Sequence, residues 1–220
     1  MFDFAAARRM MVDGQVRTND VTDPRIIAAM LELPRERFVP MRHAGLSYAD
    51  LDVPVSEAPS ARRLLKPMVL AKLIQAAEIG AQDRVLDIAC GTGYSSALLG
   101  RLASSVMALE EDPALAETAR DNLREVGAAN VKVEAGPLSE GWPAGAPYDV
   151  ILLNGAAEIV PDRLLRQLGE GGRLVGVVGQ SPAGKGIVYR CRGGRASRLP
   201  IFDAAAPPLR GFAEPPAFVF

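Results

Sequence analysis

The chain has 220 residues, of which 49% are hydrophobic and 23% are charged, as is typical of a globular protein with a sizeable core. Lys and Arg number 25 and Asp and Glu number 26, so the formal net charge is −1. This balance argues against recruitment by nucleic acid or an anionic membrane, because both require a basic surface. The single histidine, His43, excludes a His-cluster metal site, so we expect no metal.

The N-terminal sequence and the cysteines predict a cytoplasmic protein. Asp3 interrupts the first apolar residues, and only a short apolar run follows Arg9, unlike the core of a signal peptide. No stretch approaches the ~20 apolar residues that span a bilayer. Cys90 and Cys191 form neither a CxxC pair nor a disulfide framework, which fits a reducing cytosol.

Residues 1–66 are predicted to form an extension on the acceptor side of a domain made by residues 67–220, the two packing as one unit. Asp23-Pro24 resembles an N-cap followed by proline at the first helical position, and the helix that it begins ends at Pro34. The segment 35–60 is rich in proline and turn residues, so we expect irregular structure there.

From Pro67 onward, helical and strand patterns alternate. In chain order they predict a helix over 67–80, a strand over 84–88, a helix over 96–103, a strand over 105–110, a helix over 113–126, strands over 130–134 and 148–153, a helix over 163–168, a strand over 173–179 and a hairpin of 187–191 with 198–202. This alternation predicts an α/β, Rossmann-like fold, with a mostly parallel sheet and helices on both faces.

The turn after the first of these strands carries the main functional signal. Gly91 and Gly93 let a ligand approach the backbone at the start of a helix. Ser96 stands where a dinucleotide fingerprint has its third glycine, and no P-loop lysine follows. Asp87, four residues before Gly91, would repel a pyrophosphate and attract a cation. The pattern therefore favours S-adenosylmethionine, which carries a sulfonium and an ammonium group.

A second acid strengthens this interpretation. Glu110 ends the second predicted strand, where a carboxylate can accept hydrogen bonds from both ribose hydroxyls. The alternative is that Asp87 and Glu110 are ordinary acids at strand ends. Four further positions at the same edge of the sheet are candidate cofactor-binding residues: Ala89, Tyr94, Gly136 and Asn154.

Three blocks of this sequence resemble the protein-L-isoaspartate (D-aspartate) O-methyltransferase family. They are Val21-Thr22-Asp23 through Pro34-Arg35-Glu36-Arg37-Phe38-Val39-Pro40, the turn from Val85 to Leu99 with Glu110, and Ala146-Pro147-Tyr148-Asp149 through Gly171-Gly172-Arg173-Leu174-Val175. The resemblance implies a class I methyltransferase fold and methyl transfer from S-adenosylmethionine to an isoaspartyl carboxylate, leaving S-adenosylhomocysteine. In the family this reaction begins protein repair. We expect a protein, a peptide or a small carboxylate as acceptor, and the charge balance argues against a nucleic acid or membrane partner.

The sequence departs from the family in the catalytic segment. The family has Thr-Ile-Ser-Gln-Pro where this chain has Arg63-Leu64-Leu65-Lys66-Pro67, so Leu65 takes the serine position. Two further departures are Gly136-Pro137-Leu138 in place of Gly-Asp-Gly, and Asn154-Gly155 in place of Thr-Ala. Leu65 predicts weak isoaspartyl turnover. The alternative is that Arg63 or Lys66 holds the acceptor carboxylate.

Several residues allow more than one interpretation. Arg62, Arg63 and Lys66 form either a solvated face or a site for an anionic acceptor. His43 is read as a loop histidine and Cys90 as a small packing residue. The apolar tail, residues 215–220, is expected to dock on the domain or on a second subunit.

Three functions stay open at this level. The first is a repair-type isoaspartyl methyltransferase. The second is a methyltransferase of the same fold with another carboxylate, a small molecule or a modified peptide as acceptor. The third is a protein that binds the cofactor without turnover.

Overall fold

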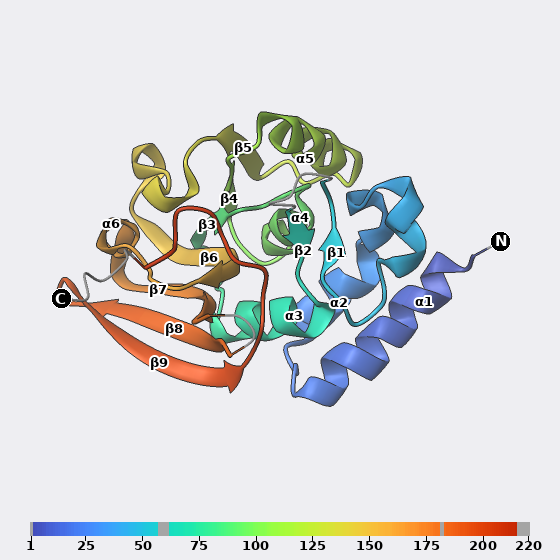
Figure 1. Ribbon diagram of the computed structural model, residues 1–220, viewed down its shortest axis with the longest axis horizontal. Helices are drawn as coiled ribbons and strands as arrows, with labels where there is room; N and C mark the ends of the chain where they lie inside the picture. The colour runs from blue at the N-terminus through green and yellow to red at the C-terminus, as the bar shows by residue number, and fades with distance from the viewer. Residues whose placement is uncertain (1, 57–61, 181–182, 215–220) are drawn as a thin grey trace, which may run out of the picture.

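The structure, a computed structural model, describes residues 2–56, 62–180 and 183–214 (Figure 1). Its centre is a seven-stranded sheet in the order β5-β4-β3-β6-β7-β8-β9. The strands are β3 (Arg84–Ile88), β4 (Ser105–Glu110), β5 (Val131–Ala135), β6 (Tyr148–Ala157), β7 (Leu168–Val178), β8 (Lys185–Arg192) and β9 (Arg195–Asp203). The five strands from β5 to β7 are parallel, and the β8–β9 hairpin adds two antiparallel strands. The mostly parallel sheet is therefore confirmed.

The two faces of the sheet bury different sets of side chains because alternate residues of a strand point to opposite sides. Val85 of β3 belongs to one hydrophobic cluster, together with residues of α3 (Pro67–Ala76), α4 (Tyr94–Gly100) and α5 (Pro113–Glu125). Leu86 and Ile88 belong to the other, with Leu138 and with residues of α6 (Asp162–Leu165) and of the segment 204–212. Asp87 lies between Leu86 and Ile88 in β3, so its side chain points toward α4.

The N-terminal part is more regular than its sequence predicts. It contains α1 (Phe4–Met11), a π-helix (Val12–Val16), α2 (Pro24–Glu32) and 3₁₀ turns over Arg17–Asn19, Arg35–Phe38 and Met41–Leu46. The Asp3 side chain caps α1 by accepting from the Ala6 N–H at 2.9 Å. The sequence pattern shows Asp3 only as a charge that interrupts an apolar run, whereas in the structure it is the N-cap of α1. Asp23 caps α2 as expected, accepting from the Arg25 N–H at 2.8 Å.

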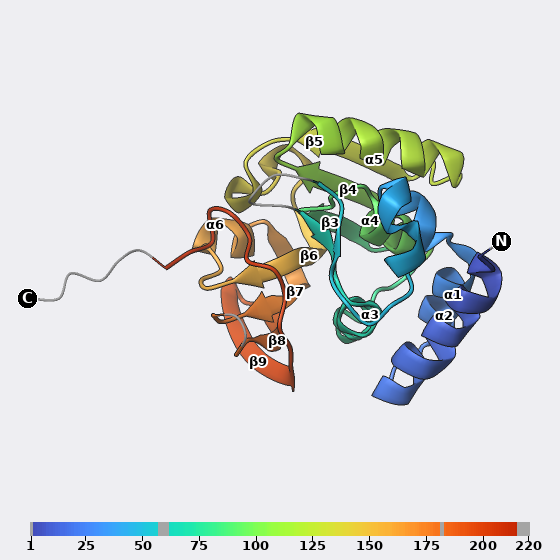
Figure 2. The same ribbon diagram turned by 45° about the vertical axis from the view of Figure 1, so that its right-hand side comes forward.

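The N-terminal part and the sheet share one core. Met30 and Phe38 belong to the same buried cluster as Leu70 and Leu73 of α3. α1 and α2 lie beside each other at one end of the molecule (Figures 1 and 2). A two-residue ladder joins β1 (Val53–Pro54) to β2 (Arg63–Leu64), and this ribbon lies beside α4 in both views. The division of roles between residues 1–66 and 67–220 remains our proposal.

Several predicted boundaries shift in the C-terminal half. β6 continues to Ala157 and β7 begins at Leu168, because Leu168 pairs with Tyr148 and Ala157 pairs with Val178 despite two register shifts between these pairs. The helix expected over 163–168 is only four residues long, in α6. Residues 204–212 then run alongside the end of β6, where the Ala156 N–H donates to Pro207 O at 2.7 Å. The predicted docking of the apolar tail, residues 215–220, lies outside the described residues.

The conformation of Gly93 provides a test of the turn geometry. Gly93 has φ +95°, and a Cβ placed there would come within 3.3 Å of the Leu123 side chain in α5. Gly93→Ala should therefore lower the free energy of unfolding of the cofactor-free protein by about 1–3 kcal/mol, as measured by urea denaturation. Gly14→Ala is the control, because a Cβ at Gly14 meets nothing within 4 Å. Equal stabilities of the two variants would contradict this account of the turn.

Candidate functional site

The carboxyl ends of β3, β4 and β5 meet at one edge of the sheet. Ile88 of β3 pairs with Leu109 of β4, so the glycine turn after β3 comes level with Glu110. Gly91 and Gly93 have φ values of +58° and +95° within this turn. The close approach of turn and acid follows from the parallel register, as the sequence predicts.

The carboxylate of Glu110 is fully buried and accepts from three backbone N–H groups in two segments. Its Oε2 accepts from the Gly91 N–H at 2.8 Å. Its Oε1 accepts from the N–H groups of Glu111 at 2.9 Å and Asp112 at 3.2 Å, immediately before α5. Glu110 therefore fixes the glycine turn against the β4–α5 connection.

Asp87 is also fully buried, and its carboxylate is held by three side chains. Its Oδ2 accepts from the hydroxyls of Ser95 at 2.7 Å and Ser96 at 2.6 Å, in the first turn of α4. Its Oδ1 accepts from the Asn154 side-chain amide at the end of β6. Burial raises the pKa of the Asp87 carboxyl to about 7, although the three donors favour its ionised form.

The structure places the side chain of Tyr94 away from the turn surface. Tyr94 is fully buried, with the Arg35 guanidinium 4.7 Å from its ring centroid and Phe38 edge-on at 5.4 Å. Its backbone begins α4, so only the backbone is placed to contact a ligand. Ala89 takes φ +65°, and its N–H donates to Leu109 O at 2.8 Å. Cofactor contacts of Ala89 and Tyr94 stay predictions.

A cavity of about 620 Å³ lies beyond the ends of β4 and β5. Gly136 lines it, and Pro137 and Leu138 supply apolar walls at the position where the related family usually carries an acid. Glu111 and Arg210 add charged groups to the rim. Apolar and charged residues thus share the lining of this cavity.

The segment at the family's catalytic position is anchored through its backbone. One peptide group is held from both ends: Leu65 O accepts from buried Arg35 at 2.7 Å, and the Lys66 N–H donates to Asp52 at 2.9 Å. The Leu65 side chain is 2% exposed and belongs to the core. Arg63 is exposed and donates to Asp52 O at 3.1 Å.

Among the three basic residues before Pro67, Arg62 reaches the glycine turn. Its Nη2 lies 3.1 Å from Glu110 Oε1 and 3.0 Å from Glu111 Oε1. The sequence pattern indicates only that Arg62 belongs to a basic cluster and does not predict that it pairs with Glu110 and Glu111. They come from the β1–β2 pairing, which is a contact between segments distant in sequence.

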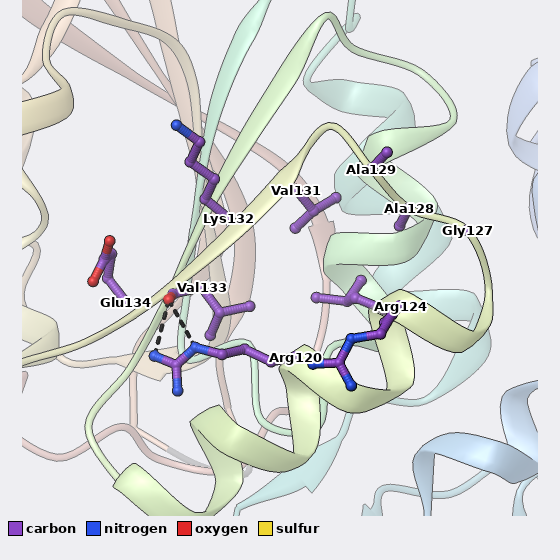
Figure 3. Close-up of a pocket in the computed structure, with 10 residues that line it drawn as sticks. Arg120, Arg124, Gly127, Ala128, Ala129, Val131, Lys132, Val133 and Glu134 are labelled. Carbon is purple, nitrogen blue, oxygen red and sulfur yellow. Dashed lines mark hydrogen bonds between the residues drawn. The ribbon is translucent and has the colours of Figure 1, made fainter.

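A second cavity, of about 490 Å³, lies between α5 and β5, away from this site (Figure 3). Arg120, on its wall, donates to the backbone carbonyl of Val133 at 3.0 and 3.3 Å. None of the predicted site residues lines this cavity, and the contacts of Arg120 stabilise the packing of α5 on β5.

In residues 2–56, 62–180 and 183–214, no group of three or more His, Cys, Asp or Glu side chains is arranged to hold a metal ion. None of the helices in these ranges combines the length and apolar character needed to span a bilayer. Cys90 and Cys191 are buried free thiols, and His43 Nδ1 lies 3.0 Å from Pro54 O in the N-terminal part.

The sheet and the glycine turn define a class I, Rossmann-like methyltransferase that uses S-adenosylmethionine. The pattern of the protein-L-isoaspartate(D-aspartate) O-methyltransferase family matches residues 7–192, and the chain belongs to this family. The protein-L-isoaspartate O-methyltransferase of Koribacter versatilis (strain Ellin345) is 39% identical over 208 residues, which cover 94% of this chain and 92% of the relative. That of Methanoculleus marisnigri is 36% identical, covering 93% and 91%.

Two solved structures share the fold. One, a protein-L-isoaspartate O-methyltransferase, has a TM-score of 0.80 and 24% identity, with 93% of this chain and 66% of that chain covered. The other, from Plasmodium falciparum and solved in complex with S-adenosyl-L-homocysteine, has a TM-score of 0.77 and 16% identity, with 96% and 99% covered. The expected α/β methyltransferase fold is therefore confirmed.

The raised pKa of Asp87 predicts a specific pH dependence of stability. The pKa of Asp87 is about 7 in the folded chain against an ordinary value of 3.8, so the folded state binds the extra proton between these values. The stabilisation of the folded state by this proton is fully present below about pH 4. As the pH rises from there through 7 the stabilisation is lost, and the free energy of unfolding falls by at most about 1.4 kcal/mol per pH unit.

Asp87→Asn should remove this pH-dependent loss of stability, as measured by free energies of unfolding between pH 5 and 8. Asp121→Asn, at an exposed position of α5, should leave the profile unchanged. Parallel profiles for wild type and Asp87→Asn would refute the assignment.

Proposed function

We propose that this chain methylates carboxylate groups of protein or peptide acceptors, with the isoaspartyl carboxylate as the first candidate, in the cytoplasm. The observation that carries the proposal is the Glu110 carboxylate, bonded to the Gly91 N–H beside the cavity that Gly136 lines. The names of the relatives support the isoaspartyl acceptor.

The residues at this edge fit S-adenosylmethionine. Gly91 leaves the turn free of a side chain where a ligand must approach the backbone, and Glu110 is an acceptor for ribose hydroxyls. We assign the adenine to the cavity that Gly136 lines, where Pro137 and Leu138 are apolar and Glu111 and Arg210 are charged. Asp87 and Asn154 lie beneath the turn, where a buried negative charge favours the cationic cofactor over a dinucleotide.

Methyl transfer to a carboxylate needs no general base from this chain. The cofactor supplies an electrophilic methyl group, and a carboxylate acceptor is already ionised at pH 7. The chain has to align the acceptor oxygen and exclude water. The segment 63–67 is the candidate for this task, because its Leu65–Lys66 peptide group is held in place by Arg35 and Asp52.

A second candidate function follows from Leu65. No hydroxyl is present at this position, and the leucine side chain is buried in the core. The chain would then use a different carboxylate, a small molecule or a modified peptide as acceptor, or bind the cofactor without turnover. Labelled-methyl transfer to fractionated lysate separates these outcomes, because a pure binding protein labels no fraction.

Binding of S-adenosylhomocysteine tests the role of Glu110. Glu110→Ala should weaken the affinity measured by calorimetry by about 10- to 100-fold, because hydrogen bonds to a charged group contribute roughly 1.5–3 kcal/mol. Glu117→Ala is the matched control, since Glu117 lies exposed on α5 and pairs with Arg120. Wild-type affinity in Glu110→Ala would exclude Glu110 as the ribose-binding residue.

Methyl transfer to an isoaspartyl peptide tests Leu65. Wild-type turnover should be low, and Leu65→Ser should exceed Leu65→Ala by about tenfold or more, because an oriented polar contact contributes on the order of 10²-fold. Leu65→Ala is the control, since it opens a similar space in the core without adding a hydroxyl. Robust wild-type turnover that falls in Lys66→Ala and ignores Leu65→Ser would assign the acceptor carboxylate to Lys66 instead.

A further inference from the structure

The hydrogen-bond donors around Glu110 converge on one of its two oxygens. A carboxylate oxygen offers about two lone-pair sites. Oε1 accepts from the backbone N–H groups of Glu111 and Asp112 and also from Arg62, whose Nε and Nη2 lie 3.3 and 3.1 Å away. Oε2 accepts from the Gly91 N–H. A ribose hydroxyl cannot reach Oε1 while the guanidinium stays, so the carboxylate cannot bind both ribose hydroxyls.

The stem of the Arg62 side chain also covers the glycine turn. A Cβ built on Gly91 would lie 3.2 Å from Arg62 Cγ and 3.6 Å from Val55 Cγ2. The approach to the Gly91 backbone, which a ligand needs, is therefore filled by Arg62 and by Val55 of the same hairpin. The cavity that Gly136 lines reaches Glu111, but its walls include neither Glu110 nor Gly91.

The backbone of Arg62 is held, so the side chain is the part that can move. Its carbonyl accepts from the Val55 N–H at 2.9 Å, and its N–H donates to the Ser56 hydroxyl at 3.1 Å. The next residue, Arg63, lies in β2 and is exposed, with its guanidinium on Asp52 O. Two adjacent arginines thus differ in whether they touch the glycine turn.

We propose that Arg62 is an internal competitor for the ribose subsite, so that cofactor binding must displace its guanidinium from Glu110. The proposal rests on the assignment of Glu110 as the ribose-binding residue. The pair is nearly dry, with side-chain exposures of 10% for Arg62 and 0% for Glu110, so breaking it has a real cost. Glu111 lowers the free-energy cost of separating Arg62 from Glu110. Its carboxylate lies 3.0 Å from Nη2 and can still pair with the displaced guanidinium.

Calorimetry with two ligands tests this competition: S-adenosylhomocysteine, and 5′-methylthioadenosine, which has the ribose but no amino-acid group. Arg62→Ala and Arg62→Gln should each bind both ligands on the order of tenfold more tightly than wild type, because Glu110 is released. Arg124→Ala is the control and should bind both as wild type does, because Arg124 lies exposed on α5 and pairs with Asp121. Arg62→Gln keeps a polar side chain of similar length, which protects the test if Arg62→Ala does not fold.

Three results would overturn the proposal. Unchanged affinities in both Arg62 variants would mean that the guanidinium does not compete with the ligand for Glu110. Weaker binding of S-adenosylhomocysteine with unchanged binding of 5′-methylthioadenosine would mean that Arg62 holds the amino-acid carboxylate. Binding of neither ligand by any variant, wild type included, would remove the ribose subsite itself. That last pattern separates failure of the site assignment from failure of the competition.

Discussion

The carboxylate of Glu110 is the interaction on which the site depends. It is fully buried, so its charge must be compensated locally. Three backbone N–H groups and Arg62 supply that compensation, drawn from the glycine turn, the start of α5 and the β1–β2 hairpin. The Glu110 carboxylate thereby holds these segments together at the carboxyl edge of the parallel strands. Ligands bind at this edge in open α/β sheets.

Asp87 plays a complementary part on the face that α4 covers. Its hydrogen bonds to Ser95, Ser96 and Asn154 connect the first turn of α4 to the end of β6. Because burial holds its pKa near neutrality, a cationic ligand nearby would favour the ionised form. Glu110 thus fixes the glycine turn against the start of α5, and Asp87 fixes the first turn of α4 against the end of β6. Under our proposal, Glu110 also accepts from ribose hydroxyls and Asp87 supplies a negative charge near the cofactor.

The sequence predicted the parts of this architecture that rest on local patterns. The strand over Ser105–Glu110 was predicted to the residue, because a short apolar run between turn signals admits few alternatives. The pairing of Glu110 with the glycine turn followed from parallel register. The sequence did not predict the burial of Tyr94 under Arg35, because that contact depends on how the N-terminal part folds back over α4. The partners of Arg62 were missed for the same reason: it and Glu110 are 48 residues apart in the chain.

The segment 63–67, our candidate for holding the acceptor, is positioned through its backbone. Arg35 and Asp52 hold the Leu65–Lys66 peptide group from opposite ends, so the segment keeps its place without a hydroxyl at Leu65. The chain therefore keeps the fold of this family, with a leucine buried in the core where the family carries its serine.

A crystal structure of the chain with S-adenosylhomocysteine tests the central claim most directly. The account predicts ribose hydroxyls within hydrogen-bond distance of Glu110, the adenine in the cavity beside Gly136, and the Arg62 guanidinium moved off Glu110. A ligand bound elsewhere, with the Arg62–Glu110 ion pair intact, would contradict it.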